Sequence, residues 1–148
     1  MPEQLTLNDG ATIPRIGLGV WQVDPDITAK VVRWGIEAGY RLIDTAEGYR
    51  NEEGVGEAIR SAGVPRKELF ITSKLRNGAH RRDDALRAFD DTMAKLGIDR
   101  IDLFLIHWPV PGQNNDVEAW KTLVELKEAG RITSVGVSNF TQEHLERI

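Results

Sequence analysis

Four side chains capable of acid–base chemistry occur at or just after apolar runs of the sequence. Asp44, Lys74 and His107 each end such a run, and Tyr49 follows Asp44 by five residues. A carboxylate, an ammonium, an imidazole and a phenol can bind and transfer protons when they meet at one point. Taken alone, each is more often a cap, a solvated charge or a core residue, so the hypothesis requires that the four converge.

The elements that would position these side chains follow from alternating apolar runs and amphipathic segments. A hairpin is expected between Leu5 and Ile13, around the turn residues Asn8-Asp9-Gly10. The expected strands are 16–19, 41–44, 69–74, 101–107 and 134–138, and the expected helices lie in 27–38, 55–62, 86–96 and 117–124. We expect Asp24, Asn51 and Asp83 to cap the first three helices, and Gly39, Gly63, Gly97 and Gly130 to end the four.

The expected strand ends Asp44, Lys74, His107 and Ser138 lie about 30 residues apart, which is the length of a strand–helix unit. Strands this apolar are covered on both faces, as in a parallel sheet. The pattern predicts an α/β fold: a partial (β/α)8 TIM barrel with an N-terminal hairpin and about four and a half βα units. Residues 1–148 would form a single incomplete domain, since a full barrel takes about 250 residues. The alternative is a complete five-stranded doubly wound domain.

Composition excludes several classes of function. The net charge is −4 and charges of both signs are interspersed, so the basic stripe typical of nucleic-acid binding is missing. The chain has no cysteine, and His80, His107 and His144 lack the spacing of metal ligands, so we expect no metal. No apolar stretch approaches the about 18 residues of a membrane span, and no secretory pattern follows Met1. We therefore expect a cytoplasmic protein that binds neither nucleic acid nor membrane.

Several motifs together carry a resemblance to a known family. They are Asp44-Thr-Ala-Glu-Gly-Tyr49, Lys74, Leu105-Ile-His107-Trp108-Pro109 and Gly136-Val-Ser138-Asn139-Phe140, preceded by Gly17-Leu-Gly19-Val-Trp21. The combination resembles the aldo-keto reductases, and bacterial NADPH-dependent small-molecule reductases in particular. The likeness extends over essentially the whole chain and corresponds to the N-terminal half of the family's barrel.

The resemblance implies NADPH-dependent reduction of aldehyde or ketone carbonyls to alcohols. Tyr49 would donate the proton, Lys74 would stabilise the phenolate, Asp44 would hold Lys74, and His107 would orient the carbonyl oxygen. By the same resemblance, the substrate would contact Trp21, Tyr49, His107 and Trp108, and the cofactor would contact Gly19, Val20, Asp44, Ser138 and Asn139. Val20 is a departure, because many relatives carry a hydroxyl residue there.

The family's cofactor-stacking tyrosine and its adenosine-phosphate contacts belong to the second half of the barrel, which this sequence lacks. Gly17-Leu-Gly19 also lacks the third glycine of a dinucleotide-binding fingerprint, so we do not expect this chain alone to bind NADPH. Pairing with a complementary half-barrel or self-association is expected instead. Two alternatives are a non-catalytic remnant of the family and a barrel aldolase forming a Schiff base through Lys74. Asp44 opposes the aldolase, because it would keep Lys74 charged.

Overall fold

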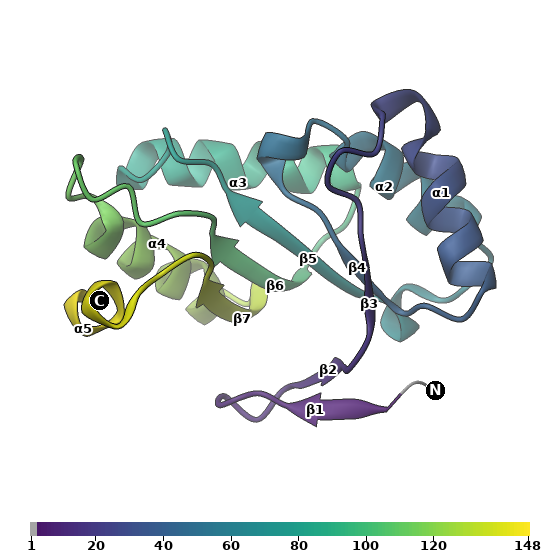
Figure 1. Ribbon diagram of the computed structural model, residues 1–148, viewed down its shortest axis with the longest axis horizontal. Coiled ribbons are helices and arrows are strands. Elements are labelled where there is room, and N and C mark those ends of the chain that lie inside the picture. Colours follow the sequence, from purple (N-terminus) through teal and green to yellow (C-terminus); the bar gives the residue numbers. More distant parts are fainter. Residues whose placement is uncertain (1–2) are drawn as a thin grey trace.

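The computed structural model describes residues 3–148, beginning with the expected hairpin. Strand β1 (Gln4–Thr6) pairs antiparallel with β2 (Thr12–Pro14), and Gly10 in the turn has a φ of 86°. Asp9, also in the turn, accepts a hydrogen bond from Lys127 of helix α4 (Asp116–Glu128) at 2.6 Å. This bond is the main reason why the pKa of Asp9 falls to about 2. The hairpin, purple at the bottom of Figure 1, is therefore fastened to the body of the fold.

Five parallel strands form the central sheet. They are β3 (Gly17–Gly19), β4 (Leu42–Asp44), β5 (Phe70–Leu75), β6 (Ile101–Ile106) and β7 (Ile132–Val137). Their order in the sheet is the same as their order in the sequence, and each neighbouring pair is parallel. In a doubly wound domain, the order of the strands would reverse at one point in the sheet. The alternative architecture is therefore wrong, and the barrel-type winding is confirmed.

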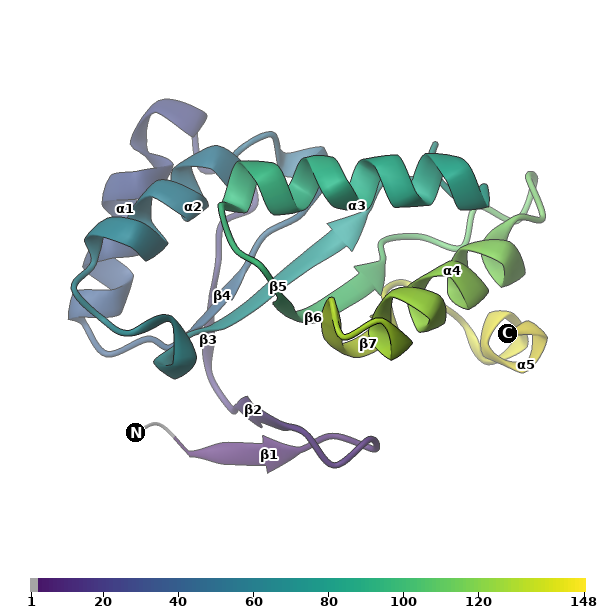
Figure 2. The ribbon, with the colours of Figure 1, turned by 180° about the vertical axis from the view of Figure 1, so that it is seen from behind.

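The helices cover one side of this sheet. They are α1 (Pro25–Glu37), α2 (Glu52–Ser61), α3 (Arg82–Leu96), α4 and the short α5 (Gln142–Arg147), with 3-10 turns η1 (Glu47–Tyr49) and η2 (Arg66–Glu68). Helices α1 to α4 pack on one another in order, and α2, α3 and α4 lie in front of the strands in the view from behind (Figure 2). Phe104 and Ile106 of β6 are fully buried, whereas Leu103 and Leu105, which alternate with them, are only half-buried. The opposite face of the sheet is thus the more open one.

The helix ends test the predicted caps. Asp24 caps α1 by accepting from the Asp26 amide at 2.9 Å, as predicted. Two predicted caps are wrong. Asn51 precedes α2, but its side chain makes no capping bond, because it is used in contacts with other loops. Helix α3 begins at Arg82, so Asp83 lies inside its first turn, where a negative charge suits the helix dipole.

The four predicted helix-ending glycines are confirmed. Gly39, Gly63, Gly97 and Gly130 all have positive φ at or just past the end of a helix. Within residues 3–148, no helix combines the length and apolarity needed to cross a membrane.

Candidate active site

Strand register places the predicted acid–base residues on the open face. Asp44 lies opposite Gly19 of β3 and Thr72 of β5, and Lys74, two residues past Thr72, lies opposite Leu105 of β6. Residues two apart in a strand share a face. His107 follows Leu105 by two residues, just beyond the end of β6, so the same rule directs it to this face. The structure thereby gathers the predicted groups at the carboxyl ends of three adjacent strands.

Lys74 is the centre of the site. Its side chain is buried, and Nζ donates to Asp44 Oδ1 at 2.6 Å, to the Thr45 carbonyl at 2.9 Å and to Tyr49 Oη at 3.3 Å. These three acceptors match the three N–H bonds of an ammonium. Asp44 neutralises the charge and the Thr45 carbonyl helps to anchor it, while the longer contact presents it to the phenol. A cation so placed can stabilise a phenolate.

Tyr49 is carried by the turn η1, directly after β4. Its amide donates to the Ala46 carbonyl at 3.0 Å, and Arg50 leaves the turn in a left-handed conformation with a φ of 58°. The Tyr49 ring meets the His107 ring edge-on, with centroids 5.7 Å apart. The phenol therefore contacts both the Lys74 ammonium and the His107 imidazole.

His107 is held by its backbone. Its amide donates to the Leu75 carbonyl at 3.2 Å, and its carbonyl accepts from Asn139 Nδ2 at 3.0 Å. Partial burial lowers the pKa of His107 below 6.5, the positive charge of Lys74 lowers it further, and Asp44 opposes the shift. A neutral imidazole is thus favoured at neutral pH, and it can donate one hydrogen bond to a substrate oxygen.

We expect Lys74→Met to raise the pKa of His107, because it removes a repulsive positive charge, and Asp44→Asn to lower it. An NMR pH titration of the His107 ring measures both shifts, with His80→Gln and His144→Gln used to assign the resonances. Lys127→Met, which removes a lysine charge far from the site, should leave this pKa unchanged. An unchanged or lower pKa in Lys74→Met would contradict the arrangement.

The lowered pKa of His107 makes the stability of the folded chain depend on pH. The unfolded chain binds a proton at His107 near the ordinary pKa of 6.5, while the folded chain binds it only at lower pH. The contribution of His107 to the free energy of unfolding therefore decreases as the pH falls below 6.5.

The predicted cofactor contacts divide into two groups. At the end of β7, Asn139 has a φ of 61° and donates to Ser138 Oγ at 3.0 Å as well as to His107. Its Oδ1 makes no hydrogen bond in the described part of the chain, and the Ser138 hydroxyl keeps its own proton to donate. A Cβ at Gly19 would meet nothing within 4 Å, so the backbone there is open beside Asp44. Val20, by contrast, is fully buried in the core, so its side chain is not available to a cofactor.

The predicted substrate contacts also separate. His107 and Trp108 line a shallow pocket of about 370 Å³ together with Gly48, Arg76, Asn77 and Gly78. Trp108 is 48% exposed, which is consistent with a surface residue rather than a core residue. Trp21 is 68% exposed in the loop after β3 and does not line this pocket. The structure therefore places Trp108 at this pocket beside His107, and the substrate contact of Trp21 stays a prediction.

Sequence reasoning missed several residues that support the site. Asn51 accepts from Thr45 Oγ1 at 2.8 Å and donates to the Val20 carbonyl at 2.8 Å, which ties the Trp21 loop to the end of β4. Glu47 forms an ion pair with Arg76. Glu47 lies two positions before Tyr49, and Arg76 lies two positions after Lys74. Their opposite charges were the signal that could have predicted the ion pair.

The fold is part of a (β/α)8 barrel, and the predicted acid–base residues lie together at the carboxyl ends of its strands. Residues 15–148 match the model of the Aldo/keto reductase family, and the chain belongs to this family. An aldo-keto reductase from Mycolicibacterium smegmatis is 50% identical, with 98% of this chain and 53% of that protein covered. Methylglyoxal reductase DkgA from Escherichia coli is 48% identical, with 99% and 53% covered.

A solved structure agrees in shape. The crystal structure of a Gox0644 mutant in complex with NADPH is 48% identical and matches with a TM-score of 0.94, covering 100% of this chain and 53% of that one. The chain thus spans about half the length of the relatives that it matches.

Proposed function

We propose that this chain supplies the acid–base half of an NADPH-dependent reductase that converts aldehydes or ketones to alcohols. The observation that carries the proposal is the position of Lys74 Nζ, which contacts both Asp44 Oδ1 and Tyr49 Oη beside the His107 ring. A phenol ionises far above neutral pH, so it needs a neighbouring cation to exchange a proton readily. Family membership supports the same chemistry.

In the proposed mechanism, the substrate carbonyl lies in front of His107 and Tyr49. The neutral imidazole donates a hydrogen bond that orients the carbonyl oxygen. NADPH, held through its carboxamide by Ser138 and Asn139, would supply the hydride for the carbonyl carbon. Tyr49 Oη then donates its proton to the oxygen as negative charge develops there, and Lys74 stabilises the phenolate that remains. Asp44 keeps the ammonium in place throughout.

The described residues fit the nicotinamide end of the cofactor. A carboxamide needs one acceptor and one donor, which Asn139 Oδ1 and the Ser138 hydroxyl can provide. The open backbone at Gly19 leaves room for a ring beside Asp44. We propose that the adenosine-phosphate contacts come from a complementary half-barrel or a second copy of the chain, which would also cover the half-buried Leu103 and Leu105.

The structure favours this chemistry over the Schiff-base aldolase. An amine nucleophile requires a free lone pair. All three N–H bonds of Lys74 have acceptors, and the closest is the carboxylate of Asp44 at 2.6 Å. Lys74 is thus arranged to stay an ammonium. Borohydride trapping of a substrate on Lys74 would support the aldolase instead.

The proposal is tested by joining residues 1–148 to the second half of Escherichia coli DkgA. We expect the fusion to oxidise NADPH and to form one alcohol per NADPH with small aldehydes, including methylglyoxal. A Lys74→Met fusion serves as the matched control and should bind NADPH without turnover. A folded fusion that binds NADPH, as shown by a cofactor-induced fluorescence change, but does not reduce any aldehyde would overturn the proposal in favour of a non-catalytic remnant.

A further inference from the structure

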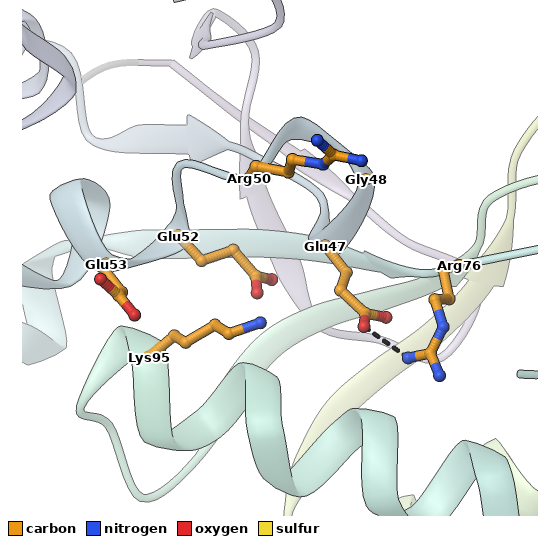
Figure 3. Close-up of a pocket in the computed structure, with 7 residues that line it drawn as sticks. All are labelled: Glu47, Gly48, Arg50, Glu52, Glu53, Arg76 and Lys95. Atoms are coloured by element: carbon orange, nitrogen blue, oxygen red, sulfur yellow. Dashed lines mark hydrogen bonds and ion pairs between the residues drawn. The ribbon is translucent and has the colours of Figure 1, made fainter. Parts of the chain in front are cut away.

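An ion pair joins the two elements that carry the phenol and the ammonium. Glu47 and Tyr49 belong to the same turn, η1, and Arg76 follows Lys74 by two residues at the end of β5. Arg76 Nη1 donates to Glu47 Oε1 at 2.5 Å, the contact drawn dashed in Figure 3. Two links therefore connect η1 to the end of β5: Lys74 with Tyr49 inside the site, and Arg76 with Glu47 beside it.

The Lys74 link alone holds the phenol weakly. Its Nζ lies 3.3 Å from Tyr49 Oη, slightly longer than a typical hydrogen bond from nitrogen to oxygen. The shorter bonds of Lys74 go to Asp44 and Thr45, which precede η1 in the chain. Lys74 would therefore keep its strongest partners even if η1 moved away. A second link between η1 and the end of β5 would therefore help to keep Tyr49 within reach.

The packing behind η1 is also open. A cavity of about 500 Å³ lies there, lined by Glu47, Gly48, Arg50, Glu52, Glu53, Arg76 and Lys95. Figure 3 shows the Glu47 carboxylate reaching from η1 toward Arg76 along one side of this space, with Glu52 and Lys95 on the other. The Glu47 and Gly48 side of the turn borders this space, so packing does not hold that side in place, whereas Tyr49 packs on the core.

The ion pair between Glu47 and Arg76 can fix the position of η1, because Glu47 is the more buried partner. The Glu47 side chain is 11% exposed and the Arg76 side chain 47%. Glu47 Oε2 is buried and has no hydrogen-bond partner within residues 3–148, so Arg76 is the main compensation for this charge. Separating a largely buried carboxylate from its partner is unfavourable, although the half-exposed Arg76 makes the loss smaller than for a fully buried pair. The turn η1 is thus restrained to the position in which Glu47 reaches Arg76.

We propose that Glu47 and Arg76 are positioning residues, which hold η1 so that the Tyr49 hydroxyl stays within reach of Lys74 Nζ and the substrate. This inference rests on the proposed reductase function for its kinetic consequences, but not for its geometry. A displacement of about 1 Å can cost a reaction up to about 100-fold in rate.

The kinetic test uses the fusion described above with a small uncharged aldehyde. We expect Arg76→Met to lower kcat by about 10- to 100-fold, and KM is measured separately because Arg76 also lines the pocket beside His107. Arg76→Lys, which keeps the charge, should recover part of the loss. Arg33→Met is the matched control, because it removes the Arg33–Glu57 ion pair between α1 and α2, far from the site, and should leave kcat unchanged. A kcat of Arg76→Met within twofold of the parent, or a change in KM alone, would overturn the proposal.

The double variant Glu47→Met/Arg76→Met separates positioning from stability. Arg76→Met alone leaves Glu47 buried and uncompensated, whereas the double variant removes both charges and should recover the unfolding midpoint. Positioning predicts that kcat stays low in the double variant, because η1 has lost its ion pair with β5 and keeps only the longer 3.3 Å contact of Tyr49 with Lys74 as a side-chain hydrogen bond to β5. Recovery of kcat together with stability would show that the pair has a purely structural role.

A readout without turnover keeps this test independent of the reductase function. The edge-on contact between the Tyr49 and His107 rings makes the NMR shifts of the His107 ring protons depend on where Tyr49 lies. Tyr49→Leu gives the reference shift without the aromatic neighbour. We expect the double variant to move the His107 shifts toward this reference and Arg33→Met to leave them in place. Unchanged shifts in the double variant would overturn the proposal even if the fusion reduces no aldehyde.

Discussion

Replacing Tyr49 by Phe in the fused barrel is expected to lower kcat by about 10²- to 10⁴-fold, the range typical of losing a positioned general acid. The substitution removes one oxygen and keeps the ring. The ring contacts with His107 at 5.7 Å and with Lys74 at 4.9 Å can therefore persist, and substrate and cofactor binding should change little. Steady-state kinetics with NADPH and an aldehyde measure the loss, and it should fall almost entirely on kcat.

Tyr40 offers the matched control, because the chain contains two tyrosines. It lies between α1 and β4, outside the candidate site, where its amide donates to the Gly35 carbonyl. Tyr40→Phe makes the same chemical change and should leave kcat unaltered. Equal turnover by Tyr49→Phe and the parent would remove Tyr49 from the mechanism, and with it the role assigned to Lys74.

The fold was largely predictable because its signals are local. Apolar runs about 30 residues apart specify strand–helix units, and Gly39, Gly63, Gly97 and Gly130 stop helices through backbone conformations that need no distant partner. The caps were less predictable. Asn51 has the residue type and position of a cap, but it bonds to Thr45 and Val20, and the sequence gives no sign of that competition.

The candidate site was predictable where alternation along strands decides the outcome. Asp44 ends β4 and Lys74 lies one residue before the end of β5, and such a position fixes both the face and the edge of the sheet at which a side chain lies. The pair Glu47–Arg76 was not found, because it depends on how two loops 29 residues apart approach each other. The burial of individual residues could not be predicted from the sequence either. Val20 and Trp21 are adjacent in the sequence, yet one is fully buried and the other 68% exposed.

The second large effect is expected for Gly56→Ala, in the middle of α2. An ideal Cβ at Gly56 would lie 2.5 Å from the Lys95 carbonyl oxygen and 2.6 Å from that of Leu96, both in the last turn of α3. These are backbone atoms, so they cannot rotate away as a side chain would. The two helices must separate, which would also strain the bond from Arg60 Nη1 to the Leu96 carbonyl. We expect a net loss of about 2 kcal/mol in the free energy of unfolding.

Gly35→Ala in α1 is the control, since it adds the same methyl group to a buried helical glycine. Its Cβ would lie 2.5 Å from Leu18 Cδ2, the tip of a half-buried side chain, and no closer than 3.6 Å to the next atom. Leu18 can change rotamer, and alanine is favoured over glycine within a helix by about 1 kcal/mol, so this variant should lose little or no stability.

Urea unfolding of the fusion compares the two midpoints. A Gly56→Ala midpoint equal to that of Gly35→Ala would show that α2 and α3 do not meet backbone to backbone. Helix α2 also carries Glu52, whose carboxylate accepts a hydrogen bond of 2.6 Å from Ser73, the residue before Lys74. Such a result would therefore contradict both the packing of the helices and the contact by which α2 supports the site.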